Sequence, residues 1–125
     1  MKCADSNNRG PNGSKMKPQL DALTKSILAF RDARDWKQFH NPKDLALALS
    51  IEASEVNELF LWKSHDLVDK RRLKEELGDV FIYLLLLAHT AGIDLEESAR
   101  MKLKANARKY PVRKSRGKST KYTDL

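Results

Sequence analysis

The stretch that decides the fold is EELGDVFIYLLLLA, residues 75–88, in which an acidic start leads directly into nine consecutive apolar residues. Around it, apolar residues recur at three- and four-residue steps, the period of an α-helix, at Leu73, Leu77, Val80, Leu84 and Leu87. The other residues of the run widen this stripe until the helix is apolar on almost every side. Such a helix needs partners on more than one side, so we expect it to pack within its own chain and against a second subunit.

Three other segments share this period, and the sequence therefore predicts helices at residues 18–36, 42–62, 68–91 and 94–110. Asn41 is a favoured N-cap, and Pro42 suits the first position of a helix. Gly92 is typical of the residue that follows a helix, and Asp94 with Glu97 forms a capping box. Four helices joined by short links predict an all-α fold, a four-helix antiparallel bundle that assembles into a homo-oligomer.

Length and composition favour a single domain, since the chain has 125 residues, of which 41% are hydrophobic and 33% charged. We expect a disordered leader at residues 1–17, a helical domain at 18–111 and a basic tail at 112–125, extended from Ser115 onward. The longest apolar run is far shorter than the ~20 residues of a membrane helix, and no signal peptide is visible. Cys3 is the only cysteine, which fits a reducing compartment. We therefore expect a cytoplasmic protein without membrane contact.

Charge is unevenly distributed along the chain. Residues 44–79 hold nine acids against five bases, whereas residues 100–121 hold ten bases and no acid, within a net charge of +7. A basic segment of this kind is found in nucleic-acid-binding proteins, but only Tyr110 and, just beyond the segment, Tyr122 are available to stack on bases. A helical nucleic-acid-binding module is therefore the alternative interpretation, and a solvated face with a loose end is the simplest one.

Two pairs of acids lie on either side of the link between the second and third predicted helices. Glu52 and Glu55 are three residues apart, as are Glu76 and Asp79, so each pair lies on one face of its helix. Like charges at this spacing repel and destabilise a helix. If the two helices are antiparallel neighbours, all four carboxylates converge, and a bound cation would relieve their repulsion.

The ligand types narrow the choice of cation. Carboxylate oxygens suit hard cations such as Mg²⁺, or Mn²⁺. Di-iron bundles require a histidine three residues after a glutamate, and none of the three histidines has that spacing. Glutamate clusters are also common on solvated faces, which is how we interpret Glu58 and Glu75, because Arg71 and Arg72 lie a turn before Glu75.

The acidic pairs and their surroundings resemble a known family. Similar stretches, in order, are RDWKQFHNP (residues 34–42), ELFLWK (58–63), EELGDVFIYL (75–84), KYP (109–111) and KYTDL (121–125). Together they resemble the MazG-like all-α nucleotide pyrophosphohydrolases, in the dCTP pyrophosphatase branch. The resemblance runs from about Leu20 to the C-terminus. Glycines that commonly fall within the first acidic motif of this branch are replaced here by Ala53 and Ser54.

The resemblance implies a Mg²⁺-dependent enzyme that hydrolyses dCTP, modified dCTP or other dNTPs to the monophosphate and pyrophosphate, as nucleotide-pool house-cleaning. It also implies a homotetramer with sites at subunit contacts. By position, Glu52, Glu55, Glu76 and Asp79 would bind the metal, and Glu55 is the preferred candidate for orienting or deprotonating the attacking water.

The substrate-binding residues are expected in two groups. A base can stack between aromatic faces, for which we select Trp36 and Trp62, with His40 and Tyr83 completing the pocket. The triphosphate needs cations and hydrogen-bond donors because the sequence has no phosphate-binding loop. The candidates for this second group are Lys63, Lys102, Asn106, Arg108, Lys109 and Tyr110. Without the resemblance, the tryptophans and Tyr83 would be assigned to the hydrophobic core.

Overall fold

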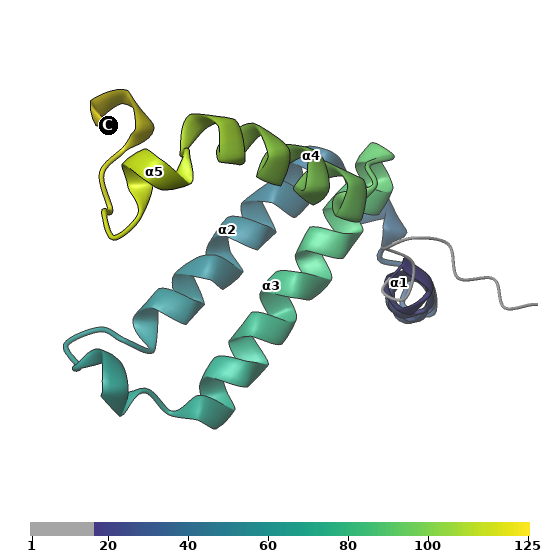
Figure 1. Ribbon diagram of the computed structural model, residues 1–125. Helices are drawn as coiled ribbons and strands as arrows, with labels where there is room; N and C mark the ends of the chain where they lie inside the picture. The colour runs from purple at the N-terminus through teal and green to yellow at the C-terminus, as the bar shows by residue number, and fades with distance from the viewer. Residues whose placement is uncertain (1–16) are drawn as a thin grey trace, which may run out of the picture.

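The computed structural model describes residues 17–125, and all regular secondary structure within them is helical (Figure 1). The long helices are α1 (Lys17–Asp32), α2 (Pro42–Glu58), α3 (Lys70–Ala91) and α4 (Leu95–Lys109). Short helical turns follow in the links and the tail: η1 (Lys37–Phe39), η2 (His65–Leu67), α5 (Val112–Ser115) and η3 (Tyr122–Asp124). The all-α prediction is confirmed. The predicted leader, apart from its last residue, lies outside the described residues.

The predicted caps set where three of the helices begin or end. The Asn41 side chain accepts a hydrogen bond from the Asp44 backbone N–H at 2.9 Å, directly before Pro42. Asp94 accepts one from the Glu97 N–H at 3.0 Å. Gly92 follows α3 with φ of +67°, a left-handed conformation that a residue without a Cβ adopts at little cost.

Two helices end earlier than the apolar pattern predicts. After α1, Asp35 adopts a φ of +54°, and the Trp36 N–H bonds back to the Arg31 carbonyl at 3.1 Å. After α2, the N–H groups of residues 59–61 bond to carbonyls three residues earlier, and Trp62 then has a φ of +60°. Tightened turns of this type are common at helix ends, and apolar periodicity does not reveal them.

The hydrophobic core lies where α1, the first half of α2 and the second half of α3 meet. Its buried members are Ile27, Leu45, Leu85 and Leu86, and Leu45 is only 1% exposed. The helices α2 and α3 form the most extensive contact, and α1 packs against α3. The opposite end of the α2–α3 hairpin extends away from this core (Figure 1).

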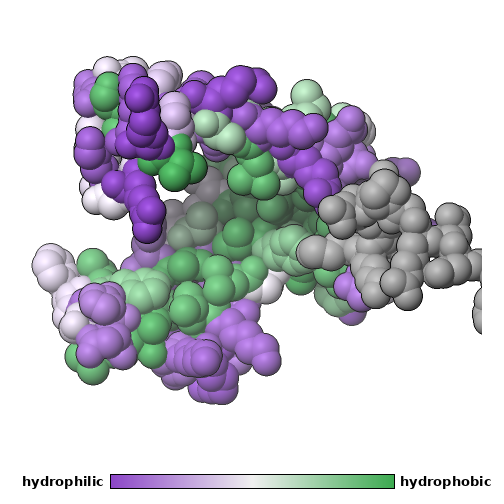
Figure 2. Space-filling model, viewed as in Figure 1, coloured by the Kyte–Doolittle hydropathy of each residue, from purple (hydrophilic) through white to green (hydrophobic). Residues whose placement is uncertain are grey.

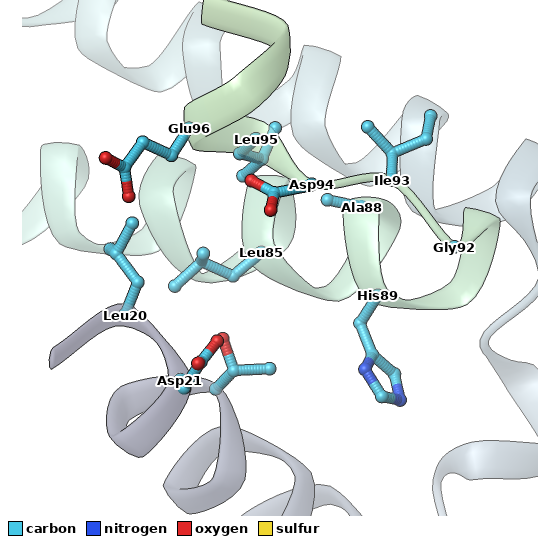
Figure 3. Close-up of a pocket in the computed structure, with 11 residues that line it drawn as sticks. Leu20, Asp21, Leu85, Ala88, His89, Gly92, Ile93, Asp94, Leu95 and Glu96 are labelled. Carbon is cyan, nitrogen blue, oxygen red and sulfur yellow. The ribbon is translucent and has the colours of Figure 1, made fainter. Parts of the chain in front are cut away.

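The fourth helix leaves the packed helices rather than running beside them. The axes of α3 and α4 differ by 97°, and α4 reaches the core through Leu95 in its first turn (Figure 1). Where α1 approaches the α3–α4 link, a pocket of about 290 Å³ remains, with Leu20, Leu85 and Glu96 among its lining residues (Figure 3). No single helix in the described part of the chain is long and apolar enough to span a membrane. Taken together, α3 and α4 have the length and composition of a membrane span, but the chain bends by 97° between them.

The C-terminal tail differs from the extended segment that the sequence suggested. It turns at Gly117, which has a φ of +73°, and returns to the end of α4 (Figure 1). There the Tyr122 ring packs edge-to-face on Tyr110, with ring centroids 5.8 Å apart. The Lys109 ammonium lies 4.9 Å from the Tyr122 ring centroid. Tyr110 and Tyr122 lie twelve residues apart in sequence, and no periodic pattern predicts their contact. We call α4 together with residues 110–125 the arm.

Large apolar side chains remain exposed along α2, α3 and the arm. Figure 2 shows this apolar surface across the hairpin, with a hollow between it and the more polar arm. The exposed residues include Leu47, Ile51, Leu61, Trp62, Leu77, Phe81, Met101, Leu103 and Val112. An apolar surface of this extent is typical of a surface that binds another protein.

Candidate active site

The two acidic pairs converge as the antiparallel arrangement of α2 and α3 predicts. Carboxylate oxygens of Glu52, Glu76 and Asp79 all lie within 4.8 Å of one another. Glu55, one turn along α2 from Glu52, interacts with both glutamates of this group. The helix contact between α2 and α3 therefore places carboxylates from both predicted motifs in one cluster.

Burial and charge repulsion within the cluster raise the pKa values of two of its glutamates. Burial, then a hydrogen bond and repulsion from Glu55, and then repulsion from Asp79 and Glu76 raise the pKa of Glu52. Desolvation and then repulsion from Glu55 and Asp79 raise the pKa of Glu76, although Arg72 opposes this. The cluster thus holds negative charge at an energetic cost.

The donor set fits a hard divalent cation. All the ligand atoms available in the cluster are carboxylate oxygens from Glu52, Glu76 and Asp79, with Glu55 beside them. A cation among them would remove the repulsion that raises the pKa values of the two glutamates. The predicted ligand chemistry is therefore compatible with the positions that the side chains occupy.

A pocket of about 460 Å³ opens beside this cluster. Glu52 and Asp79 line one part of it, together with Tyr83, whose pKa is raised by burial and then by the charges of Glu52 and Asp79. Trp36 and His40 also line it, and the Trp36 ring packs edge-to-face on Phe30 with centroids 5.9 Å apart. The pocket therefore combines carboxylates and aromatic side chains drawn from three helices and the α1–α2 link.

The surroundings of His40 favour its uncharged form. Burial first and the nearby Arg31 second lower the pKa of His40, and its Nδ1 atom is buried without a partner among the described residues. At neutral pH a histidine with a lowered pKa is uncharged.

The remaining predicted substrate residues lie elsewhere in this chain. Trp62 is 94% exposed, and Lys63 follows it in the turn at the far end of the hairpin. Asn106, Lys109 and Tyr110 lie in the second half of α4 and just after it, on the arm. None of these five residues lines the pocket within the single chain that the structure describes from residue 17 onward.

Six lining residues were not selected from the sequence. They are Ser26, Ile27, Phe30, Arg31, Ile82 and Leu86. Ile27 and Phe30 lie three residues apart on α1, and Ile82 and Leu86 belong to the apolar run at residues 80–88. Arg31 did leave a signal, because it follows Ile27 by four residues and therefore places a charge on the buried face of α1.

The chain is similar in sequence and in fold to known proteins. The family model described as the MazG-like family matches residues 47–125, which include both acidic pairs. The dCTP pyrophosphatase 1 of Bos taurus is 40% identical over 124 residues, which cover 93% of this chain and 73% of that protein. The human protein of the same name is 39% identical, over 86% of this chain and 68% of its own length. A crystal structure of a pyrophosphatase from Archaeoglobus fulgidus aligns with a TM-score of 0.71 at 39% identity, covering 74% of this chain and 93% of the other.

Proposed function

The chain belongs to the MazG-like family, and on this premise we propose that it is a Mg²⁺-dependent pyrophosphohydrolase that converts dCTP to dCMP and pyrophosphate. Modified dCTP and other dNTPs are the further substrates, and the role is house-cleaning of the cytoplasmic nucleotide pool. The observation that carries the proposal is the pocket in which the carboxylates of Glu52 and Asp79 lie beside the aromatic residues Trp36 and Tyr83.

The carboxylate side of the pocket is suited to the reacting phosphates. Glu52, Glu55, Glu76 and Asp79 would hold Mg²⁺, which when bound supplies positive charge against the triphosphate oxygens. Glu55 interacts with both other glutamates and is our candidate for orienting the attacking water or accepting its proton. Tyrosine is protonated at neutral pH, and burial followed by the charges of Glu52 and Asp79 raises the pKa of Tyr83 further, so its hydroxyl can donate a hydrogen bond to a phosphate or sugar oxygen.

The aromatic side of the pocket is suited to the base. Trp36 lies at the pocket with its ring in T-shaped contact with the Phe30 ring, and His40 lies nearby in its neutral form. A planar base can stack on an aromatic ring of this kind, and each stacked base contributes about 1–3 kcal/mol in single-stranded nucleic-acid complexes.

A second copy of the chain would complete the site. Trp62, Lys63, Asn106, Lys109 and Tyr110 do not line the pocket of their own chain, yet they are the residues selected for base and phosphate binding. Large apolar side chains are exposed on the hairpin and on the arm that carries these residues (Figure 2). A homo-oligomer, which we take to be a tetramer, would bury that surface and bring the arm of one copy to the pocket of another.

A nucleotide panel tests this function. Purified protein with Mg²⁺ is incubated with each NTP and dNTP, and the products are separated as monophosphate, diphosphate, phosphate and pyrophosphate. We expect dCMP and pyrophosphate in equal amounts from dCTP, with no product once EDTA is present. Release of dCDP and phosphate, or no hydrolysis of any nucleotide, would reject the proposed function.

A further inference from the structure

Arg31 is a charged residue in an unusual place. Its side chain is only 8% exposed, and it lines the pocket from the last turn of α1. Burying a guanidinium is costly unless it is paired. Its partner is the neighbouring Asp32, whose Oδ1 accepts a hydrogen bond from Arg31 Nε at 2.8 Å and lies 2.8 Å from Arg31 Nη2 in an ion pair.

This pairing leaves one edge of the guanidinium free. A guanidinium has five N–H donors in a planar fork. Asp32 takes the side edge formed by Nε and Nη2, so the terminal edge keeps one N–H on Nη1 and one on Nη2, pointing in parallel. Among residues 17–125, no acceptor other than Asp32 is bonded to the Arg31 side chain. A parallel pair of donors is a bidentate site for two adjacent acceptors.

The position of Arg31 indicates which part of a nucleotide it meets. The Arg31 carbonyl accepts a hydrogen bond from the Trp36 backbone N–H at 3.1 Å, and both residues line the pocket together with His40. Burial first and the Arg31 charge second lower the pKa of His40, which agrees with this placement. Arg31 therefore lies at the aromatic side of the pocket. At that side it meets a base or a sugar rather than the triphosphate.

The base chemistry selects cytosine. On its pairing edge cytosine presents two adjacent acceptors, O2 and N3, whereas uracil and thymine carry a hydrogen on N3. We propose that Arg31, oriented by Asp32, is a specificity-determining residue that donates both terminal N–H groups to O2 and N3 of cytosine. This role rests on the proposed function and adds to it the contact that separates dCTP from dUTP and dTTP.

A nucleotide analogue tests this contact without changing the protein. In 3-deaza-dCTP a C–H group replaces N3, so one of the two hydrogen bonds is lost. With the wild-type protein we expect kcat/KM for 3-deaza-dCTP to be about 10-fold below that for dCTP, the lower range of discrimination by a bidentate arginine. The ratio of kcat/KM for dCTP over dUTP measures the same contact.

Two variants complete the cycle. Arg31→Met removes the guanidinium, and Arg31→Lys keeps the charge without the paired donors. In both variants the ratio of kcat/KM for dCTP over 3-deaza-dCTP should fall close to one. The ratio of kcat/KM for dCTP over dUTP should fall about 10-fold. The matched control is Arg71→Met, because Arg71 is exposed on α3, pairs with Glu75 at 3.7 Å and does not line the pocket. It should leave both ratios unchanged.

The outcomes separate this role from the proposed function. If the wild-type protein hydrolyses dCTP and 3-deaza-dCTP equally well, the enzyme assignment stands and the role of Arg31 is wrong. If the Arg31 variants lose the same fraction of activity on every nucleotide, Arg31 only stabilises the pocket, and the proposal is again overturned. If no nucleotide is hydrolysed by the wild type, it is the proposed function that has failed.

Discussion

The pocket between α1, α2 and α3 and the arm formed by α4 with the tail differ in how their side chains are held. Pocket residues come from segments far apart in the sequence and are fixed by the core around Leu45 and Leu86. Arm residues are fixed by neighbours along one short segment, as where Tyr122 packs on Tyr110. The pocket carries the negative cluster, and the arm carries an excess of positive charge.

This difference indicates that the pocket and the arm have different functions. The negative, preformed pocket is suited to hold a metal and a base, whereas the positive arm is suited to neutralise a triphosphate. Because they are separated within one chain, their cooperation would depend on assembly. Substitutions in the pocket should therefore lower kcat, and substitutions in the arm should raise KM for the substrate.

The largest effect is expected from the carboxylate cluster. Asp79→Asn keeps the shape of the side chain but removes a charge that faces Glu52 and Glu76. We expect kcat for dCTP to fall at least about 100-fold, as is typical when a group that supports metal or proton transfer is lost. Pyrophosphate release measures it, and circular dichroism should show unchanged helicity. Glu75→Gln is the control, since Glu75 is exposed and paired with Arg71; equal losses in both variants would remove Asp79 from the site.

A smaller effect is expected from the positive end of the arm. Lys109→Met should raise KM for dCTP about 10-fold with little change in kcat, because a charge-assisted contact to phosphate is lost. Initial rates over a range of dCTP concentrations separate the two constants. Lys114→Met is the matched control, because Lys114 is exposed in α5, outside the group selected for phosphate binding. A fall in kcat at unchanged KM would contradict a role for Lys109 in binding.

The contacts of the tail should have a smaller effect again. Tyr122→Ala removes the ring that packs against Tyr110 and under the Lys109 ammonium. The freed lysine loses its orientation, so we expect KM to rise about threefold. Tyr122→Phe keeps the ring and should behave as the wild type. If both substitutions have the same effect, it is the hydroxyl and not the ring that matters.

The smallest effect is expected on stability, where removing the charge of Glu52 should stabilise the metal-free protein. The raised pKa of Glu52 means that the folded, metal-free protein binds a proton there more tightly than the unfolded chain does. The stability due to this proton is present below the normal carboxyl pKa and is lost as pH rises through the raised one. Glu52→Gln should therefore increase the metal-free Tm at pH 7 by about 1–3 °C.

Thermal melts at pH 5 and pH 7 measure this effect. In EDTA, the Tm of the wild type should fall more between pH 5 and pH 7 than the Tm of Glu52→Gln does. Added Mg²⁺ should raise the Tm of the wild type more than that of the variant. A lower Tm of the variant in EDTA at pH 7 would show that Glu52 is stabilising rather than repelled.

Much of the fold was predictable because its signals are local. The caps at Asn41 and Asp94, the stop at Gly92 and the apolar periods identified all the long helices among residues 17–125. The convergence of the acidic pairs was predictable for the same reason. The spacing places each pair on one face of its helix, and the short link between α2 and α3 makes these helices antiparallel neighbours. In each case a short stretch of sequence carries the information.

The features that were missed depend on contacts that follow no helical period. The return of the tail depends on Tyr122 meeting Tyr110, which no periodicity predicts. The 97° turn into α4 follows from packing near Leu95. Arg31 lies four residues after Ile27 on the apolar face of α1, but its burial beside Asp32 depends on the packing of other helices around it. Whether Trp62 and Lys109 reach a pocket depends on a second copy of the chain, which remains a prediction.

The most direct test of the cooperation between pocket and arm is subunit complementation. Asp79→Asn, with an inactive pocket, and a double arm variant of Lys109→Met with Asn106→Ala are mixed, unfolded together and refolded. If the pocket of one copy uses the arm of another, random hybrids contain sites with both parts intact, and activity at a dCTP concentration well below the wild-type KM should recover to about a quarter of the wild-type value. Activity that stays at the average of the two separate variants would show that pocket and arm do not cooperate across copies.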